Sequence, residues 1–102
     1  MVYITLVCAM GMSTGILTKK MQEAAQKKGI DVHVIAMSHT SFHSYEEKTD
    51  ILLLGPQVSH MEDELKKKYE PQGIKVSSIN MMDYGMLNGE KVLNDALELI
   101  GK

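Results

Sequence analysis

Arginine is absent from this chain of 102 residues, and all eleven of its basic side chains are lysines. Arginine forks recognise base edges and backbone phosphates, so their absence, together with a net charge of −2, argues against a nucleic-acid partner. Cysteine occurs only once. A lone cysteine excludes a disulfide within the chain and a dithiol redox centre, because both need a second thiol.

Long hydrophobic runs are also missing. No apolar stretch approaches the roughly 18 residues that span a bilayer, and no charged leader precedes the first apolar run. We therefore expect a cytoplasmic protein that does not insert into the membrane, in a compartment that keeps a lone thiol reduced. A chain of this length predicts one domain, over residues 1–102, with a single modest core.

The lone cysteine, Cys8, stands where an apolar run over residues 2–7 gives way to small and polar residues. Glycines there let backbone amides converge, and the amides of a following helix point the same way. This arrangement favours a bound phosphate and the thiolate form of a cysteine. The predicted phosphate-binding loop comprises Ala9, Met10, Gly11, Met12, Ser13, Thr14 and Gly15, with Ser13 and Thr14 suited to cap the helix and to bind the anion. The alternative is a cysteine that packs as a small apolar side chain.

Several chemistries of phosphate or cysteine need residues that the chain does not have. A Walker loop has lysine and then serine or threonine after its last glycine, whereas Ile16 and Leu17 follow Gly15. Low-molecular-weight cysteine phosphatases have an arginine where Thr14 stands and an aspartate, often before proline, as general acid. Neither proline here follows an aspartate. What remains is a thiol that accepts a phosphoryl group and holds it, as a phosphocarrier does.

Hydrophobic periodicity predicts alternating strands and helices. Strands are expected at residues 2–7, 31–37, 51–54 and 74–79, and helices at residues 16–28, 57–69 and 88–100. Ile16 is expected among the core-facing residues of the first helix, Gly29 at its end, and Asn88 as the cap of the last. Residues 38–49 are expected to form a loop, with one helical turn near 45–48. The order predicts an α/β fold, a single-domain open four-stranded parallel sheet with helices on both faces.

Three segments together resemble a known family. They are the segment 8–14 that begins with the cysteine, the segment 51–58 (ILLLGPQV), and the segment 83–85 (DYG) before the last helix. These segments resemble the IIB components (EIIB) of the bacterial phosphoenolpyruvate-dependent sugar phosphotransferase system (PTS), in the lactose/cellobiose/chitobiose branch. The resemblance covers nearly the whole chain and is closer to the cellobiose and chitobiose type than to the lactose type.

In that family, the cysteine takes a phosphoryl group from a histidine of the IIA protein and passes it to a sugar bound by the membrane protein IIC. The resemblance implies this role for Cys8, as part of a protein-Nπ-phosphohistidine–sugar phosphotransferase, with no metal or organic cofactor. It also implies the sheet order 2-1-3-4, as in the low-molecular-weight tyrosine phosphatase fold. The strand order would reverse between the first and third strands, which would place Gln57, Ser59 and Tyr84 near Cys8.

Each of these three residues also fits an ordinary structural role. Gln57 and Ser59 suit the first turn of a helix, and Tyr84 suits a half-buried aromatic position.

The chain as a whole has two alternatives to a phosphocarrier. A low-molecular-weight cysteine phosphatase or an arsenate reductase would have a similar architecture, and so would a regulatory α/β module with a structural Cys8. The sugar does not follow from this chain, because IIC recognises it.

Overall fold

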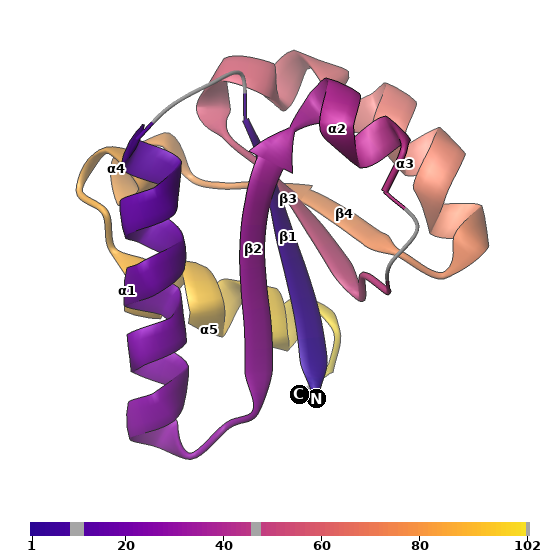
Figure 1. Cartoon of the computed structure of the whole chain (residues 1–102). Coiled ribbons are helices and arrows are strands. Elements are labelled where there is room, and N and C mark those ends of the chain that lie inside the picture. Colours follow the sequence, from indigo (N-terminus) through magenta and orange to yellow (C-terminus); the bar gives the residue numbers. More distant parts are fainter. Residues whose placement is uncertain (9–11, 46–47, 102) are drawn as a thin grey trace.

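A parallel sheet in the order β2-β1-β3-β4 forms the centre of the molecule (Figure 1). The computed structural model describes residues 1–8, 12–45 and 48–101, and within these ranges it contains four strands. They are β1 (Val2–Cys8), β2 (Val32–Ser38), β3 (Ile51–Leu54) and β4 (Lys75–Ser78). The predicted fold class and strand order are therefore confirmed.

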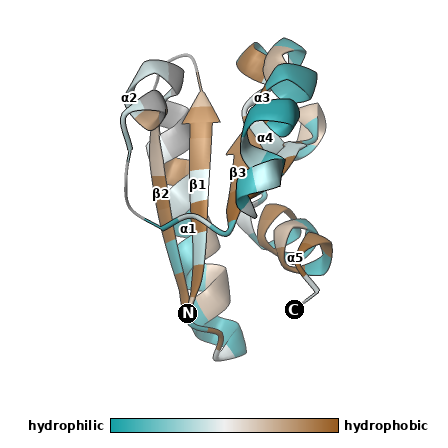
Figure 2. Cartoon of the chain, turned by 90° about the vertical axis from the view of Figure 1, so that its right-hand side faces the viewer, coloured by the Kyte–Doolittle hydropathy of each residue, from teal (hydrophilic) through white to brown (hydrophobic). Residues whose placement is uncertain are grey.

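The two central strands are the most apolar part of the sheet (Figure 2). All four residues of β3 are buried, and so are six of the seven residues of β1. Strands of this composition need cover on both faces, as in other parallel sheets. The alternation of side chains along β1 divides its residues between two separate cores.

The first core lies under α1 (Met12–Lys28) and α5 (Gly89–Leu99). These helices bury one stripe each, and α1 ends at Gly29, which adopts a left-handed conformation with φ 68°. Asn88 caps α5 as predicted, since its Oδ1 accepts from the Lys91 amide at 3.2 Å. The buried residues that α1 and α5 contribute to this core are Leu17, Met21, Ala24, Ala25, Val92, Leu93, Ala96 and Leu97.

The second core lies on the opposite face, under α2 (His39–His43), a 3-10 helix (Pro56–Met61) and α3 (Glu62–Tyr69), which a short 3-10 turn (Glu70–Gln72) follows. Phe42 and Tyr69 pack edge to face, with ring centroids 5.1 Å apart. The expected helix over 57–69 begins as the 3-10 helix Pro56–Met61, and its α-helical part starts only at Glu62, after a non-helical backbone conformation at Val58.

Three local features differ from the expectations. A short helix, α2, lies in the segment 38–49 that was expected to be a loop, and Ser38 caps it by accepting from the Ser41 amide. The helical turn expected near 45–48 includes residues 46–47, which lie outside the described residues. A further helix, α4 (Met81–Gly85), was not expected, and Asn80 caps it through the amides of Met82 and Asp83. Ile16 is 46% exposed rather than core-facing. Among the described residues, no helix has both the length and the apolarity to cross a bilayer.

The contact between α1 and α5 is close enough to require glycine at position 89. A Cβ atom on Gly89 would lie 2.6 Å from Lys20 Cβ and 2.7 Å from the Met21 backbone nitrogen. Such a contact forces backbone to move, because the Met21 nitrogen belongs to the interior of α1.

We predict that Gly89→Ala destabilises the protein by about 1–3 kcal/mol, because the added methyl overpacks this contact. The measurement is the urea midpoint followed by circular dichroism. Gly85→Ala is the matched control, since a Cβ there meets nothing within 4 Å and alanine favours a helix. Equal midpoints for the two variants would contradict the close approach of α1 and α5.

Candidate functional site

Cys8 is the last residue of β1, and β1 lies between β2 and β3. The residue is only 5% exposed. It follows Leu6 by two positions, so strand alternation directs it to the same face of the sheet as Leu6, the face that α1 and α5 cover. Cys8 lies at the carboxyl end of the strands, where α1 begins and α4 lies (Figure 1).

Three predicted site residues come together around Gly55, which directly follows β3. The Gly55 amide donates to the Val7 carbonyl at 2.8 Å and so holds the ends of β1 and β3 level. A Cβ atom on Gly55 would lie 3.2 Å from Cys8 Cβ, 3.0 Å from Gln57 Oε1 and 3.6 Å from Tyr84 Cε2. We call these four residues the Cys8 group.

Space is tight at position 55, whereas its backbone conformation does not need glycine. Its φ is −65°, which any residue can adopt, whereas a side chain would press against Cys8. Tyr84 is buried and closes one side of the group with an aromatic ring, while Gln57 is exposed and brings a side-chain amide that can both donate and accept. The group therefore combines a thiol, an apolar wall and a polar group at the end of β1.

The structure places Ser59 differently from Gln57 and Tyr84. Its hydroxyl donates to the Pro56 carbonyl at 3.0 Å, as expected of a residue in the first turn of a helix. The serine that pairs with Cys8 is Ser38, at the equivalent position of β2. Its hydroxyl donates to Ser41 Oγ at 3.0 Å and also caps α2. The sequence did not indicate Ser38, because this pairing depends on the register between two strands.

The predicted phosphate-binding loop is only partly described. Ala9, Met10 and Gly11 lie outside the described residues, and so do the side chains of Met12, Ser13 and Thr14. Because α1 begins at Met12, the loop is shorter than expected, and Ser13 and Thr14 belong to the helix instead of capping it. The first amides of any helix have no partner within the helix and form its positive end, which suits an anion beside Cys8.

The structure shows no need for glycine at position 15, and the predicted place of Gly15 in the phosphate-binding loop stays a prediction. It lies inside α1 without a positive φ, and a Cβ there would meet nothing within 4 Å. Its carbonyl accepts from the Thr18 hydroxyl at 2.7 Å. An ordinary helical residue would fit at this position.

A second polar cluster lies at the end of β4, two strands away from β1. Ser78 donates to the carboxylate of Glu62, and Lys66 Nζ lies 3.0 Å from Glu62 Oε2. The hydrogen bond from Ser78, followed by that from Lys66, lowers the pKa of Glu62 below its usual range. The cluster fastens α3 to β4.

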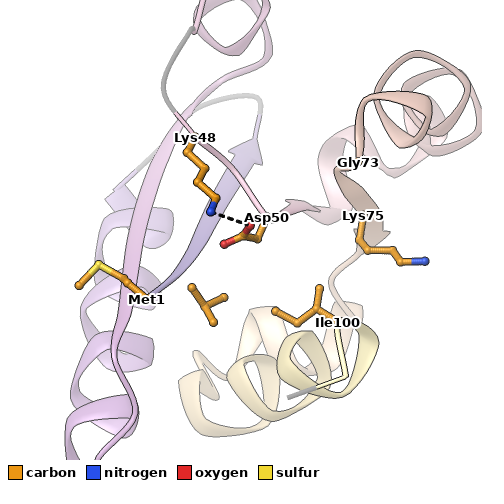
Figure 3. A pocket seen from close by; sticks show the side chains of 7 residues that line it. Met1, Lys48, Asp50, Gly73, Lys75 and Ile100 are labelled. Carbon is orange, nitrogen blue, oxygen red and sulfur yellow. Dashed lines mark ion pairs between the residues drawn. The ribbon is translucent and has the colours of Figure 1, made fainter.

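A cavity of about 360 Å³ lies at the opposite edge of the sheet, where the strands begin (Figure 3). Lys48 Nζ lies 3.9 Å from Asp50 Oδ1 on its wall. Its lining residues are Met1, Val2, Lys48, Asp50, Gly73, Lys75 and Ile100, and none belongs to the Cys8 group. Within the described part of the chain, no three histidine, cysteine, aspartate or glutamate side chains gather as metal ligands would. The thiol and its neighbours therefore mark the candidate site.

Comparison with known proteins shows the family to which the chain belongs. The family model described as "PTS system, Lactose/Cellobiose specific IIB subunit" matches residues 3–95. The galactose-specific EIIB component of Lactococcus lactis subsp. cremoris and the cellobiose-specific EIIB component of Lactococcus lactis subsp. lactis are each 44% identical to the chain over 102 residues. Each alignment covers 95% of this chain and 94% of the relative.

Solved structures support the same conclusion. The cellobiose-specific IIB component of Borrelia burgdorferi has a TM-score of 0.76 at 36% identity, over 98% of this chain and 92% of that one. A mutant of YwlE from Bacillus subtilis shares the fold alone, with a TM-score of 0.60 at 12% identity over 100% of both chains. The family model, the two relatives from Lactococcus lactis and the structure from Borrelia burgdorferi agree. This chain therefore belongs to the lactose/cellobiose-specific IIB family and is an EIIB phosphocarrier of the sugar phosphotransferase system.

Proposed function

We propose that Cys8 is the residue that carries the phosphoryl group between the IIA and IIC partners that the family implies. The observation that supports this most directly is the position of the thiol. It lies at the end of a central strand, a helix begins four residues later, and Gln57 and Tyr84 meet it around Gly55. This position suits a nucleophile that must hold a dianion beside backbone donors.

The proposed transfer has two steps. In the first, the Cys8 thiolate attacks the phosphorus of a phosphohistidine on IIA, so that an S–P bond forms while the N–P bond breaks and its electron pair stays on the imidazole. In the second, a sugar hydroxyl attacks the same phosphorus, the S–P bond breaks, the thiolate is restored, and the hydroxyl proton leaves to a base or to solvent. Neither step consumes water or needs a metal or organic cofactor.

The residues around Cys8 have distinct proposed roles. The amides of residues 10–15 and the hydroxyls of Ser13 and Thr14 would stabilise the charge that develops on the phosphoryl oxygens. Gln57 would add a side-chain amide, and the Tyr84 ring would keep water away from one side of the S–P bond. Without arginine, the chain cannot clamp the transition state of hydrolysis as cysteine phosphatases do, so the phosphocysteine would persist until an acceptor arrives.

We also propose the sugar class and the place of action. Relatives named for cellobiose and for oligo-β-mannosides, the latter 39% identical over 97 residues, support a β-linked disaccharide of the cellobiose or chitobiose type as the acceptor on IIC. Another relative is named for galactose, so transport assays would decide between galactose and a β-linked disaccharide. Membership of the family supports the cytoplasmic side of the membrane as the place of action.

Cys8→Ser tests the proposed role of the thiol. We predict that the unaltered chain gains one phosphoryl group after incubation with phosphoenolpyruvate, enzyme I, HPr and a IIA protein of the cellobiose type, and that Cys8→Ser gains none. Intact mass spectrometry measures both, and circular dichroism checks that the variant is folded. Phosphoryl uptake by the serine variant would exclude Cys8 as the carrier.

A hydrolytic function has a separate readout. The same preparations are incubated with para-nitrophenyl phosphate, and we expect no turnover that depends on Cys8. Turnover by the unaltered chain that is lost in Cys8→Ser would favour a cysteine phosphatase over a carrier, whatever the result with IIA.

Gly55→Ala tests the geometry of the Cys8 group. The added methyl would stand 3.2 Å from Cys8 Cβ and 3.0 Å from Gln57 Oε1. We predict that phosphoryl transfer from IIA slows by about ten- to a hundredfold, because displacing a reacting group by part of an ångström has effects of this size. Rapid-quench kinetics measures the rate. Gly85→Ala is the control, and equal rates for the two variants would show that the space at Gly55 has no role in transfer.

A further inference from the structure

Exposed methionines cluster on α4. In the described part of the chain, six large apolar side chains are exposed, and three of them belong to α4 and the residue that ends it. Met81 is 75% exposed, and Met82 and Met86 are 71% exposed each. We call these three side chains the methionine face. The other three, Met1, Ile16 and Leu99, belong to three different elements or ends of the chain.

The helix that carries the methionine face also contributes Tyr84 to the Cys8 group. This tyrosine belongs to α4, is buried, and lies within 3.6 Å of the position that a Gly55 Cβ would occupy. Cys8 Cβ lies within 3.2 Å of the same position. The inner side of α4 therefore forms a wall of the site, while its outer side carries exposed thioethers. Figure 1 shows α4 at the edge of the sheet where α1 begins.

The helix is fixed in this position at both ends. Asn80 caps its start, and the Asn88 amide donates to the Asp83 carbonyl at 2.9 Å beyond its end. Asp83 also lies 3.6 Å from Lys91 Nζ, so the acidic side chain of α4 is paired with a residue of α5. The exposed side of α4 is consequently presented in one orientation and is apolar in character.

We propose that the methionine face is the surface on which the phosphorylated IIA protein docks. This inference rests on the proposed function. Cys8 is only 5% exposed, so a phosphohistidine can reach its sulfur only if the donor covers the residues that border the thiol, and α4 is one of the elements that border it. Methionine side chains are flexible and polarisable, and they adapt to a partner surface better than branched residues do.

The size of the face suits a donor that leaves after each transfer. Three methionines at this exposure present on the order of 400 Å², about half of what one partner buries in a stable interface. A permanent dimer of this chain through the same face would need a larger apolar area. A transient protein donor needs no more than a small apolar centre surrounded by polar contacts.

The test removes the apolar character of the face without changing the size of its side chains. A triple variant, Met81→Gln, Met82→Gln and Met86→Gln, is compared with Leu99→Gln, which alters an exposed apolar side chain at the far end of α5. The rate of phosphoryl uptake is measured against the concentration of phosphorylated IIA of the cellobiose type. We expect the half-saturating concentration to rise about tenfold in the triple variant, with a much smaller change in maximal rate and no change in Leu99→Gln.

Each other result overturns the inference in a recognisable way. Equal half-saturating concentrations in the triple variant and the unaltered chain would show that IIA docks elsewhere. Normal uptake from IIA with slower transfer to sugar through IIC would assign the face to the acceptor. An unaltered chain that sediments as a dimer, with a monomeric triple variant, would assign the face to a second copy. No phosphoryl uptake by the unaltered chain would instead overturn the proposed function, and the docking surface with it.

Discussion

The pairing of β1 with β3 is the constraint on which the site depends. Val7 pairs with Leu54, and the Gly55 amide donates to the Val7 carbonyl at 2.8 Å. These bonds hold the two strand ends level, so Cys8 and Gly55 become neighbours. A slip of one residue would exchange the two faces of the strand and move the thiol away from the side of the sheet that α1 covers.

The same strand end positions the rest of the Cys8 group. Gly55 precedes the 3-10 helix that carries Gln57, and the Leu54 carbonyl accepts from the Ile79 amide at 2.8 Å. Asn80 then begins α4, which returns Tyr84 to Gly55. Residues from the end of β1, from the 3-10 helix after β3 and from α4 after β4 therefore meet at one residue without a side chain. This is the physical reason why a parallel sheet concentrates function at its carboxyl edge.

The same fold can support two kinds of phosphate chemistry, holding a phosphoryl group and hydrolysing a phosphate ester, and the residues of this chain suit the first. Backbone amides at the start of a helix bind a phosphoryl group, whereas rapid hydrolysis needs an arginine clamp and a positioned acid. This chain has no arginine, and neither of its prolines follows an aspartate. Its likeness in fold to YwlE thus coexists with residues that suit a carrier.

The sequence by itself determined the fold class, because the alternation of strands and helices is visible in its hydrophobic pattern. The site at Cys8, inferred from a lone thiol at the end of an apolar strand and from the absence of arginine, remains a prediction. The helix α4 was not predicted, because five residues are too few for periodicity to reveal. Only the tertiary structure decided that Gln57 and Tyr84 lie near Cys8 while Ser59 bonds to Pro56, because hydrogen bonds between distant strands fix the register.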